Sequence, residues 1–238
     1  MKGLIAIVLG VIFLVCCHQN TNTRFQRGAL HLSFDDTSVC NWEQYLLLFK
    51  EYKVKATFYI CRPQDFTPKQ WNALHHIANA GHEIACHGLH HQNPFSTRLS
   101  ASDYISKEML TCKKILVDSG FHVRTVGFPF GNAPEEMERM ALEHFTTIRR
   151  VTWDKEHKLL SQYEELFSSE KSPILTAMGI DSICAISLIS IESACKRAKE
   201  NKEYFNLIAH EINTGNPYSI SRDYLVKVLK LMEKYDLK

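Results

Sequence analysis

Three polar clusters in this 238-residue chain each follow directly on a short apolar run. They are Asp35 and Asp36 after residues 31–34, His87, His90 and His91 after residues 83–86, and His210 after residues 206–209. One carboxylate with two imidazoles leaves coordination positions open on a divalent cation, which is typical of catalytic metal sites. A second carboxylate and a further imidazole can accept and donate protons. The three clusters together therefore predict metal-assisted acid–base chemistry.

The spacing within the clusters suggests which residues bind the cation and which transfer protons. Neighbouring residues at the end of a strand point in different directions, so Asp35 and Asp36 can serve two roles, one on a cation and one on a proton. His87 and His91 are four residues apart and share a face if their segment is a helical turn. Cys86 is an alternative ligand, although its apolar strand end favours a buried thiol. Each feature alone is weak, and the combination carries the prediction.

The segments around these clusters alternate between strand-like and helix-like patterns. The expected strands are residues 29–34, 56–60, 83–86, 125–128, 146–152, 182–188 and 205–209. The expected helices are residues 42–52, 67–81, 102–119, 134–144, 192–201 and 221–235, and no element is assigned between 155 and 179. Such alternation predicts a parallel α/β fold, either doubly wound or a (β/α) barrel, in which chemistry gathers beyond the carboxyl ends of the strands.

Composition predicts a single domain. With 238 residues, 45% of them hydrophobic, the chain can bury one substantial core, and no long linker divides it. The formal net charge of +2 gives no sign of a nucleic-acid partner, and we expect a monomer. The six cysteines beyond residue 17 have irregular spacings, so we expect buried thiols rather than a disulfide framework.

The N-terminus has the pattern of an export signal. Residues 4–15 form an apolar run that is shorter than the roughly twenty residues a membrane-spanning helix needs. The ending of this run resembles a bacterial lipobox, with Cys17 as the lipidated residue, Cys16 as the alternative, and an ordinary cleaved signal as the simpler reading. We therefore expect a signal peptide over 1–17, a linker over 18–28 and the domain over 29–238, anchored by lipid in the periplasm or at the cell surface.

Four motifs in order resemble those of a known enzyme family. They are Ser33-Phe34-Asp35-Asp36, His87-Gly88-Leu89-His90-His91, Phe128-Pro129-Phe130-Gly131-Asn132 and Leu207-Ile208-Ala209-His210. This set is similar to the motifs of the polysaccharide deacetylase (NodB-homology) family, the fourth carbohydrate esterase family, from about residue 29 to the C-terminus. The resemblance implies a distorted, incomplete (β/α) barrel of about seven strands. It also implies a metal-dependent hydrolase that removes N- or O-acetyl groups from polysaccharides or oligosaccharides.

The resemblance assigns roles residue by residue. Asp35 would be the general base, His210 the general acid, and Asp36, His87 and His91 the metal ligands, with His91 preferred to His90 because the family's ligands lie four apart. The backbone of Pro129, Phe130 and Gly131 would help the metal to stabilise the oxyanion. The implied cofactor is a divalent metal, first Zn, with Co, Ni or Mn as alternatives.

The chain departs from the family pattern at the first and third motifs. Thr37 stands where Gly is usual, and Phe130 stands where many members have Tyr. Gly127 occupies the place of an Arg that normally pairs with the catalytic base. Arg149 or Arg150, at the end of the next expected strand, offers a replacement cation, and we favour Arg149.

The fourth motif is weakly represented, so rival functions and several substrates are still open. Trp153-Asp154 is its one trace, and Leu188 is a candidate for the acetate pocket or for the core. The rival interpretations are a carbohydrate-binding surface lipoprotein with weak or no turnover, and a different metal-dependent ester hydrolase. Peptidoglycan, chitin-like oligomers, xylan and capsular polymers are all open as substrates, because loops rather than the fold set that choice.

Overall fold

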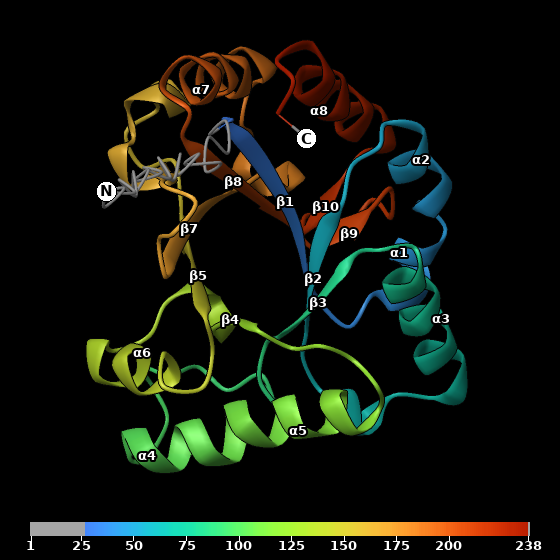
Figure 1. Cartoon of the computed structure of the whole chain (residues 1–238), viewed down its shortest axis with the longest axis vertical. Helices are drawn as coiled ribbons and strands as arrows, with labels where there is room; N and C mark the ends of the chain where they lie inside the picture. The colour runs from blue at the N-terminus through green and yellow to red at the C-terminus, as the bar shows by residue number, and fades with distance from the viewer. Residues whose placement is uncertain (1–26, 238) are drawn as a thin grey trace, which may run out of the picture.

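Seven parallel strands form a closed ring with helices around it in the computed structural model, which describes residues 27–237 (Figure 1). The strands are β1 (Ala29–Asp36), β2 (Ala56–Ile60), β3 (Glu83–Cys86), β4 (Thr125–Gly127), β5 (Thr147–Thr152), β7 (Ile174–Gly179) and β8 (Tyr204–Ala209). They pair in that order, and β8 also pairs with β1, so the ring closes. The predicted single-domain (β/α) barrel of seven strands is confirmed.

Helices connect the strands on the outside of the ring (Figure 1). They are α1 (Val39–Glu43), α2 (Leu46–Glu51), α3 (Pro68–Asn79), α4 (Ala101–Tyr104), α5 (Thr111–Asp118), α6 (Glu135–Ala141), α7 (Leu188–Asn201) and α8 (Arg222–Lys234). A π-helical segment, Ile105–Leu110, joins α4 to α5. Short 3₁₀ turns occupy Pro63–Asp65, Pro129–Gly131, Leu160–Gln162, Glu164–Leu166 and Ser182–Cys184. Three small strands complete the set: β6 (Phe167–Ser168), antiparallel to β8, and the pair β9 (Glu211–Ile212) and β10 (Ser219–Ile220).

Along β1, side chains that pack beneath the helices alternate with side chains that face the barrel interior. Leu32 and Phe34 are buried beneath the helices, and the Phe34 ring stacks on Phe58 of β2 with centroids 5.4 Å apart. Ser33 and Asp35 are also buried, on the opposite side of the strand, facing the barrel interior. The apolar packing of alternate residues therefore fixes Asp35 inside the barrel at the carboxyl end of β1.

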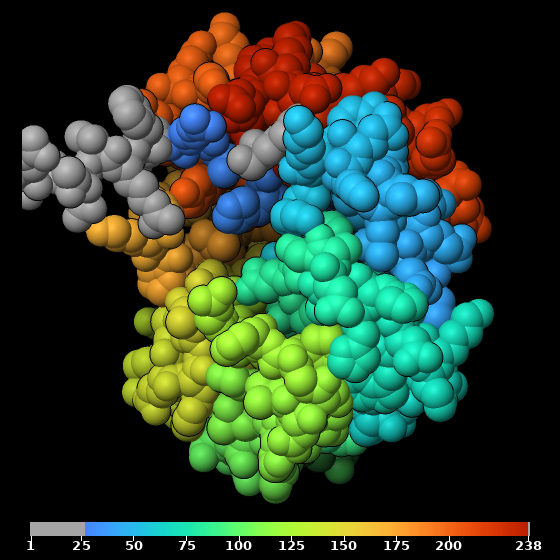
Figure 2. All heavy atoms as spheres, turned by 45° about the vertical axis from the view of Figure 1, so that its right-hand side comes forward, coloured from blue at the N-terminus to red at the C-terminus, as the bar shows by residue number. Residues whose placement is uncertain are grey.

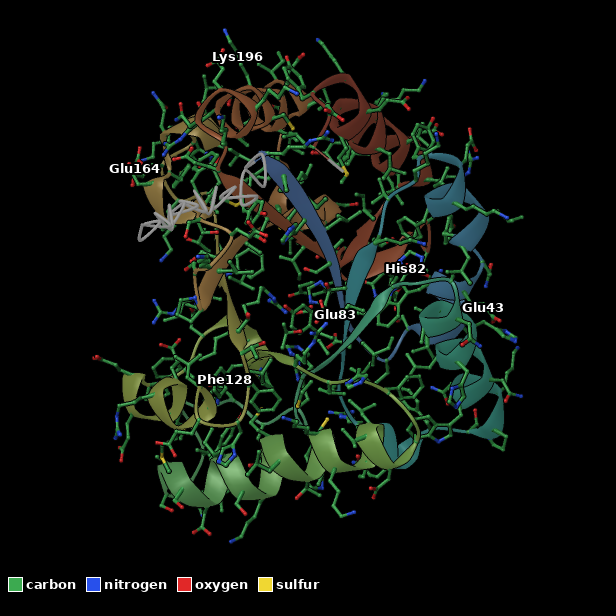
Figure 3. All side chains as sticks on the ribbon, viewed as in Figure 1. Glu43, His82, Glu83, Phe128, Glu164 and Lys196 are labelled. Atoms are coloured by element: carbon green, nitrogen blue, oxygen red, sulfur yellow. The ribbon has the colours of Figure 1, made fainter. Side chains whose placement is uncertain are left out.

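The barrel interior is polar near its amino end. Glu83 lies close to the centre of the strand ring, whereas Glu43 and Glu164 lie at the periphery of the molecule (Figure 3). The Glu83 carboxylate accepts hydrogen bonds from the hydroxyls of Thr57, at 3.0 Å, and Thr125, at 3.1 Å. Side chains on the two strands beside β3, namely β2 and β4, thus satisfy a carboxylate that faces the interior.

The two ends of the described chain meet where the ring closes. The Leu30 N–H donates to the Leu237 carbonyl oxygen at 2.9 Å, and the blue and red segments adjoin in the space-filling view (Figure 2). Gly28 passes so close to α7 that a Cβ there would lie 2.1 Å from the Ala198 carbonyl oxygen. Only glycine fits at this crossing.

Three elements differ from the sequence-based expectations. The helix expected over 42–52 is two short helices, and the one expected over 102–119 contains the π-helical segment. The strand expected over 182–188 is wrong, because Ala185 has a φ of 52° and follows a 3₁₀ turn. The strand in this part of the chain is β7, which ends at Gly179, before the expected range. Its last residues include Ala and Gly, which are uncommon in strands, so the sequence pattern did not identify it.

The predicted signal peptide over residues 1–17, with Cys16 and Cys17, lies outside the described residues, as does most of the predicted linker over 18–28. Among residues 27–237, no helix has the length and apolar character needed to cross a membrane. The six cysteines in this range are free thiols, four of them buried.

Candidate metal centre and active-site cleft

A cleft of about 500 Å³ opens at the carboxyl ends of the barrel strands. It brings together side chains from all three polar clusters of the sequence: Asp35, Asp36, His87, His91 and His210. Its walls and rim also contain Ser38, Phe130, Gly131, Val151, Trp153, Ile208, Glu211, Asn216 and Tyr218. The placement expected from parallel strands therefore holds for every cluster.

Asp36, His87 and His91 form the one group of potential metal ligands found among the described residues. One ligand atom from each lies within 4.8 Å of the other two. His91 Nε2 is 3.3 Å and His87 Nε2 is 3.7 Å from the same oxygen, Asp36 Oδ1. The His87 Nδ1–H donates to the Gly127 carbonyl oxygen at 2.7 Å, which leaves the Nε2 lone pair facing the site. This donor set fits a divalent cation that keeps open positions.

Electrostatics in the metal group suit cation binding. Burial disfavours the charged form of Asp36, but the hydrogen bond from His91 and the charges of His87 and His210 hold the pKa of Asp36 well below its usual range. Burial lowers the pKa of His87, more strongly than the neighbouring carboxylates raise it. A carboxylate and a neutral imidazole are the forms that bind metal.

The segment from His87 to His91 is a loop, so the two imidazoles are not brought together by a helical turn. Gly88 has a φ of 90° and His91 a φ of 58°, and these left-handed residues bring His91 back toward Asp36. His90 turns the other way, with its Nδ1 2.6 Å from Glu108 Oε1. The geometry therefore groups His91, and not His90, with the other two ligands.

Asp35 is paired with Arg149 beneath the cleft. Arg149 Nη2 lies 2.5 Å from Asp35 Oδ2, the two side chains are 2% and 4% exposed, and the guanidinium carbon is 4.4 Å from the centroid of the Tyr59 ring. Burial disfavours the charged guanidinium, but the charges and hydrogen bonds of Asp35 and Tyr59 together outweigh it and raise the pKa of Arg149. Asp35 Oδ2 also lies 3.5 Å from Nε2 of the ligand His87, so the carboxylate adjoins the metal group, and among residues 27–237 its Oδ1 is buried without a hydrogen-bond partner.

Gly127 makes room for this arginine. A Cβ at Gly127 would lie 2.6 Å from Arg149 Nη2. A residue larger than glycine at position 127 would therefore displace Arg149 from its contact with Asp35. Arg150 points to the opposite side of β5, where its Nε donates to Glu138 Oε1 at 2.7 Å. Of the two arginines of β5, it is therefore Arg149 whose guanidinium contacts Asp35.

His210 is held by Asp181, a residue that the sequence analysis missed. The His210 Nδ1–H donates to Asp181 Oδ2 at 2.6 Å, its backbone N–H donates to Asp181 Oδ1 at 3.0 Å, and Asp181 is 1% exposed. Burial disfavours the imidazolium, but the hydrogen bond to Asp181 and the neighbouring carboxylates raise the pKa of His210 to about 9. Asp181 follows β7 by two residues, so assignment of that strand would have marked it as a candidate.

Loss of the Asp181 contact is expected to move the alkaline limit of activity. A proton donor works only while protonated, so activity should fall as pH rises through the pKa of His210. In Asp181→Asn the loss of the neighbouring charge lowers that pKa, and the alkaline limb of the kcat profile should shift to lower pH by about one unit or more. Asp154→Asn is the matched control, because Asp154 accepts a hydrogen bond from Tyr163 and does not line the cleft. Identical limbs in wild type and Asp181→Asn would contradict the assignment.

The turn after β4 has one N–H donor left for the cleft. Pro129 has no N–H, and the Gly131 N–H already donates to the Phe128 carbonyl oxygen at 3.0 Å, which leaves the Phe130 N–H. Phe130 has a φ of 63°, and a Cβ at Gly131 would lie 2.7 Å from Val151 Cβ. The proposed oxyanion donor is therefore the Phe130 N–H, presented by a turn that needs glycine at the next position.

The remaining predicted residues divide between the cleft and the core. Trp153 lines the cleft and packs against Gly179, where a Cβ would lie 2.6 Å from the indole. Leu188 begins α7 and packs against the core, so it does not line the cleft. Tyr218, which the sequence analysis missed, lines the cleft with its ring centroid 5.7 Å from that of His210.

Comparison with known proteins places this geometry in a family. The model of the polysaccharide deacetylase family matches residues 22–147, more than half of the chain. The chain belongs to the polysaccharide deacetylase family. Among solved structures, it resembles the polysaccharide deacetylase Bc1974 from Bacillus cereus, with a TM-score of 0.57 and 15% identity, over 88% of this chain and 89% of that one. It also resembles a family 4 carbohydrate esterase from Streptomyces lividans solved with acetate, with a TM-score of 0.54 and 14% identity, over 87% and 88% of the two chains.

A polysaccharide deacetylase relative also appears among curated proteins. The YheN protein of Bacillus subtilis, whose name assigns it to these deacetylases, is 29% identical over 118 residues. The alignment covers 49% of this chain and 40% of YheN, so the chain spans less than half the length of this relative. The family is established by sequence, and the barrel by the structural likeness.

Proposed function

We propose that this polysaccharide deacetylase family member is a metal-dependent hydrolase that removes N- or O-acetyl groups from an extracytoplasmic polysaccharide or oligosaccharide. The observation that carries the proposal is the arrangement around one cleft of a metal-ligand group, the Arg149-paired Asp35, and the Asp181-paired His210. A binding module needs the cleft, but it has no chemical use for two separately paired proton-transfer groups.

Asp36, His87 and His91 would hold the divalent cation, with Zn as the first candidate and Co, Ni or Mn as alternatives. When bound, the cation supplies Lewis-acid chemistry, polarising an acetyl carbonyl and making a water molecule more acidic. Nitrogen and oxygen donors in a three-residue group, with the fourth side open to the cleft, fit that role.

The protein's own groups supply the proton transfers. The Asp35 carboxylate accepts the proton of the attacking water, and Arg149 holds this carboxylate in place through Oδ2. The Phe130 N–H donates a hydrogen bond to the oxygen on which negative charge develops. His210, held protonated by Asp181, donates a proton to the departing sugar nitrogen or oxygen. An amine leaving group requires such an acid, because it cannot depart as an anion.

Aromatic side chains at the cleft support a sugar substrate. Phe130, Trp153 and Tyr218 line it and are 61%, 40% and 51% exposed. Exposed aromatic rings offer flat apolar faces beside polar groups, which suits the faces of sugar rings. The Streptomyces relative was solved with acetate, a product of the proposed reaction.

A panel of acetylated glycans tests this proposal. Peptidoglycan, chitin oligomers, acetylated xylan and capsular polymers would be incubated with the Zn-, Co-, Ni- or Mn-loaded protein, and released acetate would be measured. Acetate release from at least one glycan is expected. Tight glycan binding without release from any glycan would favour the carbohydrate-binding surface lipoprotein. Release from simple esters or phosphates alone would favour a different hydrolase.

We further propose export and lipid anchoring through Cys17, on the strength of the N-terminal sequence pattern. Fractionation of expressing cells should find the wild-type protein with the envelope membranes, whereas Cys17→Ser should release it or leave it unprocessed. Cys16→Ser is the matched control and should keep the wild-type distribution. The same soluble distribution for all three proteins would contradict lipidation.

A further inference from the structure

The loop that carries two of the three metal-binding side chains, residues 87–91, has no regular secondary structure. Two of its residues, Gly88 and His91, adopt left-handed backbone conformations. A metal site needs its ligands held to within a fraction of an ångström, which an unsupported loop does not provide. Some neighbouring group must therefore hold this loop.

Glu108 contacts the middle of the loop through both its side chain and its main chain. Its carboxylate Oε2 accepts the His90 backbone N–H at 2.8 Å, and Oε1 is 2.6 Å from His90 Nδ1. Its main-chain oxygen accepts the Leu89 N–H at 3.0 Å. Two consecutive loop residues between the ligands His87 and His91 are thus tied to one glutamate.

The position of Glu108 depends on the π-helical segment between α4 and α5. Ile105, Glu108 and Met109 are the buried residues of this segment, and π-helical turns recur at functional sites. The Met109 carbonyl oxygen accepts a hydrogen bond from the Cys86 thiol at 3.4 Å, immediately before His87. The segment therefore contacts the chain on the amino side of His87 as well as within the loop.

The charge of Glu108 also requires these contacts. The residue is 1% exposed, and His90 is its ion-pair partner within residues 27–237. A buried carboxylate is costly unless donors satisfy it, and the loop supplies those donors. The carboxylate and the loop conformation consequently stabilise each other.

We propose that Glu108 is a positioning residue for the metal centre. By drawing His90 away from the cleft, it directs the next residue, His91, toward Asp36. The inference rests on the proposed metal-dependent function, but it concerns a residue that lies outside the ligand set.

Metal binding measured by titration calorimetry with Zn²⁺ on metal-free protein tests the proposal. Glu108→Met keeps the side-chain length but removes both acceptors, and we expect about 10- to 100-fold weaker binding, the range usual for loss of a group that orients a ligand. Glu108→Gln can satisfy the same two His90 groups with one oxygen and one N–H, and should recover most of that loss. Glu138→Met is the matched control: Glu138 is also a buried helical glutamate, but it pairs with Arg150. It should keep wild-type metal affinity even if its melting temperature falls.

The outcomes separate this inference from the function on which it rests. A wild-type protein that binds no metal would overturn both. Wild-type binding with unchanged affinity in Glu108→Met would overturn the positioning role alone, as would a Glu108→Gln variant as weak as Glu108→Met. If Glu108→Met does not fold, the His90→Ala variant tests the proposal instead. This substitution removes the contact of His90 Nδ1 with Glu108 Oε1 and leaves the Glu108 carboxylate in place. We expect it to bind Zn²⁺ roughly fivefold more weakly, and wild-type affinity would refute the proposal.

Discussion

Asp35→Asn is expected to lower kcat for acetate release by about 10²- to 10⁴-fold, the usual contribution of a general base. The amide cannot accept the proton that the Asp35 carboxylate takes in the proposed mechanism, while the ligands Asp36, His87 and His91 stay in position. Zn²⁺ affinity should therefore change by no more than about threefold. The measurement is acetate release under saturating substrate, with calorimetric metal binding on the same preparation.

Asp118→Asn provides the control for this substitution. Asp118 is an exposed carboxylate on α5 that pairs with Lys114, far from the cleft in the fold. Its loss should leave kcat unchanged. Equal kcat values for wild type and Asp35→Asn would remove Asp35 from the proton-accepting role, and a matched loss of metal affinity would instead make it a ligand.

Arg149→Met should have the largest effect on stability. The substitution leaves the Asp35 carboxylate, 4% exposed, without its cation, and breaking a buried ion pair from one side costs about 3–5 kcal/mol of unfolding free energy. The kcat should fall as well, because the substitution removes the hydrogen bond from Arg149 that holds Asp35 Oδ2. Urea denaturation of the metal-free protein measures the first effect.

The double variant Asp35→Asn/Arg149→Met separates the lost charge pair from lost packing. With both charges gone, much of the lost stability should return, since replacing both members of a buried pair is far less costly than removing one. Arg222→Met, at an exposed position on α8, should stay within about 0.5 kcal/mol of wild type. An Arg149→Met variant as stable as Arg222→Met would show that the pair is not needed.

Local patterns in the sequence were sufficient to predict a parallel α/β fold with its polar clusters at one edge, and the family resemblance selected the barrel. Apolar residues alternate along β1, which sets the face of Asp35, and parallel strands bring their carboxyl ends to one edge, which gathers His87 and His210. The family spacing selected His91, and the loop geometry now supplies the physical reason. That reason is the contact of His90 with Glu108.

Residues whose partners are distant in the chain were the ones missed. Asp181 contacts His210 across 29 residues and follows β7, a strand that the sequence-based assignment left out. Glu108 contacts His90 from a π-helical segment that no helical periodicity predicts. Contacts of this kind depend on packing between elements, so they became visible only in the folded chain.

We propose that this chain hydrolyses acetyl groups with one metal ion at Asp36, His87 and His91. Stepwise addition of Zn²⁺ to metal-free protein, with the initial rate of acetate release measured on the best glycan of the panel, tests this proposal. No release is expected at the start, followed by a linear rise and a plateau at about one equivalent of metal, since one three-ligand group is present among the described residues. The same rate before and after metal addition would overturn the proposal.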